Sequence, residues 1–214
     1  MIPHLTAALA GRQLLSHPFY QRWSQGELSR DDLRAYAEQY RYFEAALPTM
    51  LSGIHHRIDD IPTRRTVSRH LADEEGGERS HLELFDDYAA SLGATASAPT
   101  AATVALLDTY GSLVARGPAA GMAALYAYES QAAAIATTKA AGLRRWYGLD
   151  DAAIAFWDAH AHIDEHHGEW TLEALIALSE STPETVAAAS AAADAWWGLL
   201  SEREAAHVAA HAVS

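Results

Sequence analysis

Cysteine is absent from the 214 residues, and lysine occurs once, as Lys139. The absence of cysteine excludes disulfides, thiolate metal ligands and a cysteine nucleophile. A metal site in this chain must therefore be built from histidine, aspartate and glutamate. That ligand set suits iron, manganese or zinc.

Positive charge is also scarce, with 15 Lys and Arg against 28 Asp and Glu and a net charge of −13. Proteins that bind nucleic acid or anionic membranes need a basic face. No run of about 18 apolar residues is present, so a transmembrane helix is not expected. The N-terminal stretch "MIPHLTAALAGRQLL" lacks the basic start and long apolar core of a signal peptide. We therefore expect a cytoplasmic protein that binds neither nucleic acid nor membranes.

Alternating runs of β-branched residues are missing as well, whereas the strong helix formers Ala, Leu, Glu and Arg are abundant. The sequence predicts an all-α protein, a compact seven-helix bundle forming one domain over residues 1–214. The expected helices cover roughly residues 5–23, 29–59, 62–93, 101–115, 118–146, 151–178 and 183 onward. We expect a bend near Pro48 and an interruption of the third helix at Gly76 and Gly77.

The stretch "DAHAHIDEHHGEW", residues 158–170, holds four of the 12 histidines. His160, Asp164 and His167 are spaced i, i+4 and i+7, so they share one stripe of an α-helix. Imidazole and carboxylate groups on one stripe are what a metal-binding helix presents to a bundle core. His162 and His166 form a rival pair on another face. The alternative is a solvated polar face without a metal.

A second cluster lies in "HLADEEGGERSHLELF", residues 70–85. Glu74 and His81 are seven residues apart and would share a face of one helix, whereas Glu78 and His81 form the ExxH spacing of di-iron bundles. Ideal helix geometry favours Glu78. The glycine pair disfavours a regular helix, however, and a bulge there would bring Glu74 closer to His81. An exposed acidic patch is the alternative to a metal site.

Glu129 stands alone in "AALYAYESQAAAIA", a segment too apolar for a protein surface. A buried carboxylate needs a partner, which is either a metal or a hydrogen-bonding Tyr or His. Three histidines and three carboxylates suit a pair of metal ions that activate oxygen. The candidate ligands are Glu74, His81, Glu129, His160, Asp164 and His167.

Together with these residues, the segments "HPFYQRWSQGELSRDDLRAYAEQY", "LSGIHHRIDD", "DEEGG" and "AGMAALYAYESQ" resemble a known group. The sequence is similar to the haem-oxygenase-like di-metal oxidases, and within them to the chlamydial protein associating with death domains and its bacterial relatives. The similarity covers about residues 13–170. It implies a seven-helix fold, two metal ions (Fe/Fe or Fe/Mn), the six ligands given above, and O2 as co-substrate with an external reductant.

The resemblance also implies an activity, the synthesis of para-aminobenzoate for folate by a self-sacrificing oxygenase that acts about once per chain. The sacrificial tyrosine corresponds to Tyr20 in "HPFY", and the lysine that donates nitrogen corresponds to Lys139 in "ATTKAAG". Tyr36 and Tyr128 match tyrosines of the family, and they are expected to line the pocket and pass electrons or protons. A homodimer is expected from the family. Binding to death domains has no basis in this sequence.

Glu44 departs from the chlamydial sequence, where the matching position is apolar. If it points inward, it is an extra ligand or a proton acceptor. Two other functions compete with the leading one. The first is an oxidase of the same superfamily that acts on an external amine or fatty acid and does not need Tyr20 or Lys139. The second is a non-catalytic helical bundle that binds a metal or a partner. A thiaminase-like enzyme is disfavoured because it needs a cysteine.

Overall fold

The computed structural model describes residues 1–179 and 181–212, and of residues 162–165 it describes only the backbone. Within these ranges the regular structure is entirely helical, with helices α1 to α9, two short 3-10 helices and one π-helical turn. The prediction of an all-α fold is confirmed. The number of helices is higher than the expected seven because two of the expected helices are each divided in two.

The first expected helix is divided into α1, Ile2–Leu9, and α2, Pro18–Gln25. The side chain of His17 caps α2 by accepting a hydrogen bond from the backbone N–H of Phe19, and Pro18 occupies the first helical position. A proline at that position lacks only an N–H that would be unsatisfied anyway. The break therefore fixes the start of the short helix that carries Tyr20.

Helix α3, Arg30–His55, begins where the sequence predicts it. Ser29 and Asp32 form a reciprocal capping box, in which the serine side chain accepts from the Asp32 N–H and the aspartate accepts from the Ser29 N–H. Pro48 lies inside the helix. The inner face of α3 carries Tyr36, Tyr40 and Glu44 into the core.

The prediction of one helix over residues 62–93 is also wrong, because the chain leaves the helical conformation at Gly76 and Gly77. Helix α4 covers Ile61–Glu75 and α5 covers His81–Ser91. Gly76 is extended, and a Cβ placed on it would lie 2.0 Å from the carbonyl oxygen of Ala72. Gly77 adopts a φ of 75°, which favours glycine. The predicted interruption is therefore a complete break, after which the chain continues along α3 as a separate helix.

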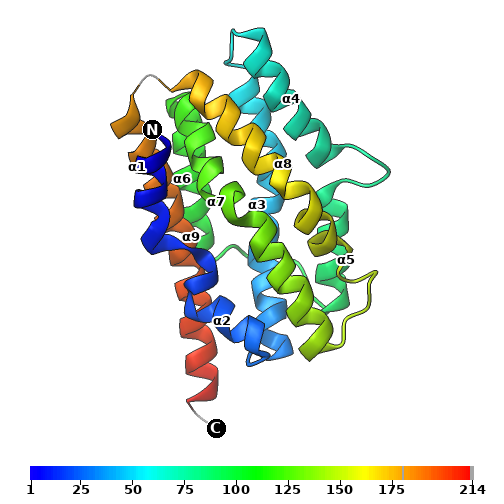
Figure 1. Ribbon diagram of the computed structural model, residues 1–214. Coiled ribbons are helices and arrows are strands. Elements are labelled where there is room, and N and C mark those ends of the chain that lie inside the picture. The colour runs from blue at the N-terminus through cyan, green and yellow to red at the C-terminus, as the bar shows by residue number, and fades with distance from the viewer. Residues whose placement is uncertain (180, 213–214) are drawn as a thin grey trace.

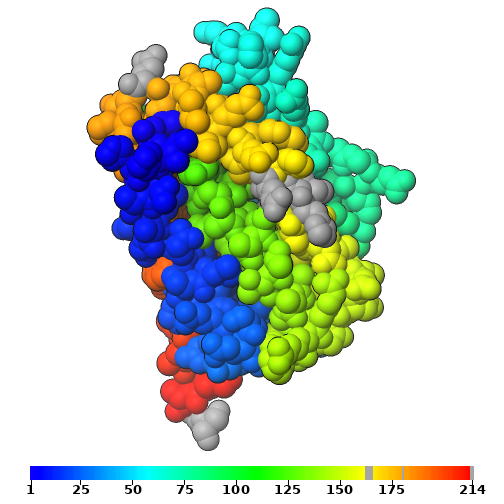
Figure 2. Space-filling view, in the orientation of Figure 1, coloured from blue at the N-terminus to red at the C-terminus, as the bar shows by residue number. Residues whose placement is uncertain are grey.

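The second half of the chain contains α6, Ala101–Arg116, α7, Pro118–Gly142, α8, Ala155–Leu178, and α9, Thr182–His211. Helix α7 packs against both α8 and α9 and is buried along most of its length. Figure 1 shows α7 and α8 side by side, with α4 and α5 beside α8 and with α1 and α9 on the opposite side of the bundle. In the space-filling view, residues of α7 and α8 form much of the front face (Figure 2). None of the helices in the described part of the chain has the length and hydropathy needed to cross a bilayer.

Candidate metal centre and the adjoining lysine and tyrosines

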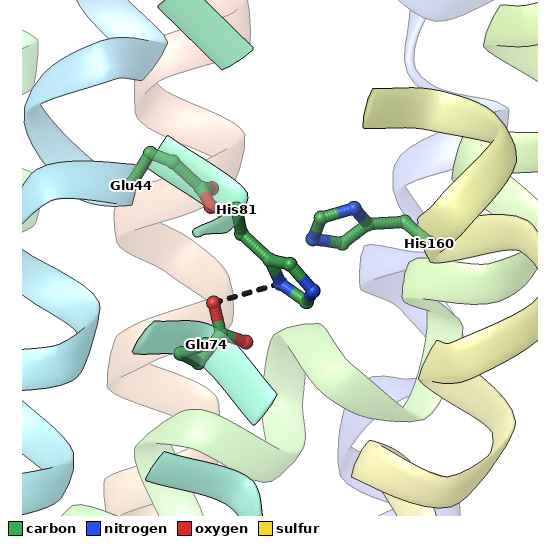
Figure 3. A group of neighbouring side chains, drawn as sticks. All are labelled: Glu44, Glu74, His81 and His160. Atoms are coloured by element: carbon green, nitrogen blue, oxygen red, sulfur yellow. Dashed lines mark ion pairs between the residues drawn. The ribbon is translucent and has the colours of Figure 1, made fainter. Parts of the chain in front are cut away.

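Four buried side chains from four helices form one group of candidate ligands. Glu44 comes from α3, Glu74 from α4, His81 from α5 and His160 from α8, and each offers one ligand atom within 4.8 Å of the others. Figure 3 shows the four side chains converging on a common point. The Nδ1 atom of His81 lies 2.9 Å from a carboxylate oxygen of Glu74. We call this group site 1.

The break between α4 and α5 positions two of these ligands. Glu74 lies in the last turn of α4, and His81 is the first residue of α5, directly after its cap Ser80. The expectation that Glu74 and His81 share a face of one helix is wrong, because the break places them on two successive helices, where their side chains face each other. Glu78 is exposed in the connecting segment, so the alternative ExxH pairing is wrong too.

A second group, site 2, adjoins the first and contains His70, Glu129 and His167. The Nε2 atom of His70 lies 3.6 Å from Glu74 and 3.8 Å from Glu129. The Nδ1 atom of His167 lies 3.4 Å from Glu74 and 4.0 Å from Glu129. The carboxylate of Glu74 therefore lies between the two sites and can serve both.

The two described histidines of the α8 stripe are oriented by different partners. In His160 the Nδ1 atom lies 2.8 Å from the backbone carbonyl of Phe156, which leaves Nε2 for a metal. In His167 the Nε2 atom lies 2.7 Å from the carboxylate of Asp73, and Nδ1 faces Glu74 and Glu129. A carboxylate on the distal nitrogen is the common way in which proteins orient a metal-binding histidine.

The remaining predictions for α8 have different outcomes. The side chain of Asp164 lies outside the described residues, and so does that of His162. His166, the other half of the rival pair, has an exposed side chain. The described residues therefore bring five of the six predicted ligands together and add His70 and Glu44.

The electrostatics of these buried groups fit divalent cations. Burial raises the pKa of Glu129, and burial together with the charges of Glu74 and Glu129 raises the pKa of Glu44 well above its usual range. Burial opposes ionisation of Glu74 as well, but the facing imidazoles of His70 and His81 hold its pKa well below its usual range. Burial and the neighbouring His81 lower the pKa of His160 to about 3. A divalent cation beside Glu44 and Glu129 would favour their ionised forms, and a neutral imidazole such as that of His160 is the form that ligates a metal.

Hydrogen bonding within the described part of the chain leaves some of these atoms unused. One carboxylate oxygen of Glu44 and both ring nitrogens of His70 have no hydrogen-bond partner among the described residues. Buried polar atoms are nearly always satisfied in folded proteins, so an unsatisfied cluster calls for a ligand. The donor set of oxygen and nitrogen atoms fits two ions such as iron or manganese.

The amine of Lys139 lies next to these sites in an aromatic enclosure. Its side chain is 1% exposed, and Nζ donates to the hydroxyl of Tyr36 at 2.5 Å. The Tyr36 hydroxyl lies 2.7 Å from the hydroxyl of Tyr20. Nζ is 4.5 Å from the centre of the Tyr20 ring and 4.1 Å from that of Trp157. The structure therefore brings the lysine and two of the predicted tyrosines into direct contact.

Burial lowers the pKa of Lys139 well below its ordinary value, and the charge of Glu44 opposes this effect. Burial also raises the pKa values of Tyr20 and Tyr36, so both phenols stay protonated. The enclosure thus favours an uncharged amine beside uncharged phenols. Glu44 is the residue that couples this cluster electrostatically to the candidate ligands, because its charge acts on Lys139 and on Glu74.

Other tyrosines extend the cluster through the core. The Tyr40 hydroxyl lies 2.7 Å from that of Tyr128, whose ring stacks on Trp196. Tyr40 also packs against Tyr36, with ring centres 5.5 Å apart. In contrast, Tyr42 donates to the backbone carbonyl of Ser97 and lies outside this cluster.

Sequence reasoning missed His70, although a signal was present. His70 and Glu74 are spaced i, i+4, so they share a face of α4. The prediction paired Glu74 only with His81, in competition with Glu78. Glu44 was singled out because the matching position of the chlamydial sequence is apolar.

Comparisons with known proteins agree with this fold and site. Residues 34–202 match a family described as iron-containing redox enzymes with a haem-oxygenase-type profile. The chain is 38% identical over 211 residues to the 4-aminobenzoate synthase of Nitrosomonas europaea, a match that covers 90% of this chain and 86% of that protein. It is 34% identical over 196 residues to the 4-aminobenzoate synthase of Chlamydia muridarum, covering 88% and 83%.

A solved structure extends the comparison to the fold. A domain of unknown function with a heme oxygenase-like fold from Shewanella denitrificans superposes with a TM-score of 0.77. The superposition covers 98% of this chain and 93% of that chain at 16% identity, which shows a common fold. The expected haem-oxygenase-like architecture is confirmed. From the family match and the two relatives together, this chain belongs to the family of iron-containing redox enzymes.

Proposed function

We propose that this protein synthesises 4-aminobenzoate from its own Tyr20, with Lys139 as the nitrogen donor. Relatives named 4-aminobenzoate synthase, 38% and 34% identical over most of the chain, support the product. The single observation that carries the proposal is the position of the only lysine. Its amine is buried 4.5 Å from the centre of the Tyr20 ring, within the same core as the candidate ligands.

The carbon skeletons of tyrosine and product support this assignment. The tyrosine ring and its Cβ atom together contain all the carbons of 4-aminobenzoate. The reaction must break the Cα–Cβ bond and oxidise Cβ to a carboxylate. It must also break the ring C–O bond, with the oxygen leaving as water, and the Nζ–Cε bond of Lys139, with Cε taking an oxygen from water as the nitrogen passes to the ring. These changes consume a residue of the chain, so each protein molecule makes about one product molecule. The oxidation requires O2 and an external reductant.

The residues around Tyr20 have distinct roles in this proposal. Lys139 provides an amine whose pKa is lowered by burial, so that its nitrogen lone pair is available. Tyr36 accepts a hydrogen bond from that amine and lies within hydrogen-bonding distance of the Tyr20 hydroxyl. It therefore holds the nitrogen close to the phenol carbon at which the new bond forms. Surrounding aromatic rings exclude water, with Trp157 and Trp23 facing the amine.

The metal ions would be held by the carboxylates and imidazoles of site 1 and site 2. Two ions, as Fe/Fe or Fe/Mn, would supply the activation of O2 and the oxidising equivalents for the reaction. Glu74 is placed to contact both ions, because it faces His81 of site 1 and His167 of site 2. The hydroxyl of Tyr40 lies 2.7 Å from that of Tyr128, and the charge of Glu44 acts on Tyr40.

An oxidase that acts on an external amine or fatty acid would use the same ligands. It would have no need for a buried lysine in contact with two tyrosines. The amine of Lys139 donates to Tyr36, and its Nζ atom lies within 5.3 Å of the centres of five aromatic rings. This enclosure favours the self-sacrificing reaction. A non-catalytic bundle is disfavoured by membership of a redox enzyme family.

Isotope labelling tests the proposal directly, because the single lysine makes the label specific to one position. The protein is prepared with lysine labelled with nitrogen-15 at the side chain, loaded anaerobically with Fe(II) alone or with Mn(II), and mixed with O2 and a reductant. We expect 4-aminobenzoate that carries the heavy nitrogen, and a Tyr20 peptide of reduced mass. Metal uptake and O2 consumption, with the peptides that contain Tyr20 and Lys139 unchanged in mass, would instead indicate an external substrate.

Substitution provides the second arm of this test. Tyr20→Phe removes the phenol that is converted to product and should abolish 4-aminobenzoate formation. Tyr42→Phe is the matched control, because Tyr42 donates to a loop carbonyl outside the cluster. Full product formation by Tyr20→Phe would contradict the proposal.

A further inference from the structure

The side chain of His70 lies in the interior of the candidate metal centre. Its side chain is 1% exposed, and neither ring nitrogen has a hydrogen-bond partner among the described residues. Its nearest polar neighbours are candidate ligands, with Glu74 at 3.6 Å and Glu129 at 3.8 Å from Nε2. The ring of His167 packs against it at 4.1 Å between centres. A buried imidazole in such a place is aimed at whatever these carboxylates bind.

The distances around His70 match those between ligands of a common ion. They exceed the usual N–H···O range, so they do not describe hydrogen bonds. Metal–nitrogen and metal–oxygen bonds of about 2.1 Å place neighbouring ligand atoms about 3 to 4 Å apart. His70 together with Glu129 and His167 has its ligand atoms within 4.8 Å of one another. The group needs only a small contraction to enclose an ion.

Glu44 holds the corresponding position at site 1. It is 2% exposed, one of its carboxylate oxygens has no hydrogen-bond partner in the described part of the chain, and its ligand atoms group with those of Glu74, His81 and His160. Its helix, α3, contributes no other group to either site. The charges of Glu74 and Glu129 act on the carboxylate of Glu44. A bound cation relieves the repulsion between such neighbouring carboxylates.

We propose that His70 and Glu44 are metal ligands, one at each site, in addition to the six residues of the sequence pattern. The described donors are then Glu44, Glu74, His81 and His160 at site 1, and His70, Glu74, Glu129 and His167 at site 2. This inference rests on the dinuclear centre of the proposed function. It predicts that each added ligand belongs to one ion, so its loss should weaken one binding event and leave the other largely intact.

The test is equilibrium binding of Mn(II) to the metal-free protein under argon, with free Mn(II) followed by electron paramagnetic resonance. We expect two ions per wild-type chain. His70→Asn and Glu44→Gln, which keep the shape of the side chain, should each weaken one binding event at least about tenfold. The matched controls are His56→Asn and Glu75→Gln, both at exposed positions, and these should bind Mn(II) like the wild type.

X-ray absorption at the manganese edge gives a readout that a purely structural role would not move. His70→Asn should lower the number of imidazoles per chain by one, whereas Glu44→Gln should leave it unchanged. Glu44→Leu tests whether weaker Mn(II) binding at this position could result from misfolding. It should melt at a higher temperature than the wild type without metal, yet gain less on adding Mn(II), because it has exchanged a buried carboxylate for an apolar group.

Failure of this inference and failure of the proposed function give different results. Wild-type affinities in both His70→Asn and Glu44→Gln, with unchanged imidazole count, would overturn the assignment of these ligands. Fewer than two ions on the wild type would overturn it as well, together with the dinuclear centre. Two ions on the wild type, weakened binding in both variants, and no 4-aminobenzoate from the iron-loaded wild type would support the ligands and sink only the proposed function.

Discussion

The amine of Lys139 donates to the phenol oxygen of Tyr36 at 2.5 Å, so this buried lysine meets a neutral hydroxyl where a carboxylate would ordinarily stand. The charge of Glu44, which lies among the candidate metal ligands, opposes the effect of burial on this amine. The arrangement is costly for a charged amine and favourable for an uncharged one. The preference for an uncharged amine should affect both the stability of the fold and the reactivity of Lys139.

Lys139→Met should stabilise the metal-free protein at neutral pH, on the order of 2 kcal/mol. Burial lowers the pKa of Lys139 in the folded state below its ordinary value of 10.5. The unfolded chain therefore binds more protons than the folded chain between these two pKa values, and the stability of the wild type rises with pH in that window. The advantage of the variant should shrink as the pH rises toward 10.5. Guanidinium denaturation at several pH values measures it.

Lys139→Arg provides a contrast for that experiment. Arginine keeps its charge at every accessible pH, so it should destabilise the fold at all of them. A constant difference between wild type and Lys139→Met across the pH range would show that the amine is charged in the folded protein.

Tyr36→Phe should lower the yield of 4-aminobenzoate about a hundredfold without changing metal binding. The hydroxyl of Tyr36 contacts both the Lys139 amine and the Tyr20 hydroxyl, and its removal frees the amine to shift by an ångström or more. Misplacement of that size typically costs about two orders of magnitude. Product per chain is measured by mass spectrometry after one exposure to O2. Unchanged yield would mean that Tyr36 has no part in positioning the nitrogen.

Asp73→Asn should weaken metal binding at site 2 by about tenfold to a hundredfold. The carboxylate of Asp73 lies 2.7 Å from Nε2 of His167, so it fixes the orientation of the ring and increases the basicity of Nδ1. Mn(II) titration of the metal-free protein gives the affinity. Glu75→Gln, two residues away and exposed, should leave it unchanged. Equal effects of both substitutions would point to general loss of negative charge rather than to orientation of His167.

The sequence was sufficient for the helices that carry strong local signals. Ser29 with Asp32 marks the start of α3, and Pro118 marks the start of α7. The break between α4 and α5 was predicted only as an interruption of one helix, because its completeness depends on a close approach of Gly76 to the Ala72 carbonyl, which a propensity argument does not contain. Local chemistry thus predicts where helices begin more reliably than whether two segments remain one helix.

In the candidate site, too, some residues were predicted from local sequence and others depend on tertiary packing. His160 and His167 follow from helical spacing alone, since both lie on one stripe of α8. The pairing of Glu74 with His81 depends on the break between two successive helices, so no single-helix geometry predicts it. Burial of Lys139 depends on aromatic rings from three other helices, α2, α3 and α8. Such contacts are properties of the packed bundle and are not encoded in any short segment.

Ser80→Ala should reduce the free energy of unfolding by about 1 kcal/mol and weaken metal binding as well. The Ser80 side chain accepts from the Glu83 N–H, and the Glu83 carboxylate accepts from the Ser80 N–H. These two hydrogen bonds fix the first turn of α5. His81 is the first residue of that turn, and its Nδ1 lies 2.9 Å from Glu74. Loss of the cap therefore loosens a ligand along with the helix.

Two measurements separate these effects, chemical denaturation of the metal-free protein and Mn(II) affinity. Ser24→Ala, at an exposed position in α2, is the control and should change neither quantity. Adding metal should recover part of the stability lost in Ser80→Ala, because binding to the folded state pulls the first turn of α5 back into place. A loss of stability with unchanged Mn(II) affinity would show that the segment connecting α4 and α5 holds His81 in position without its cap.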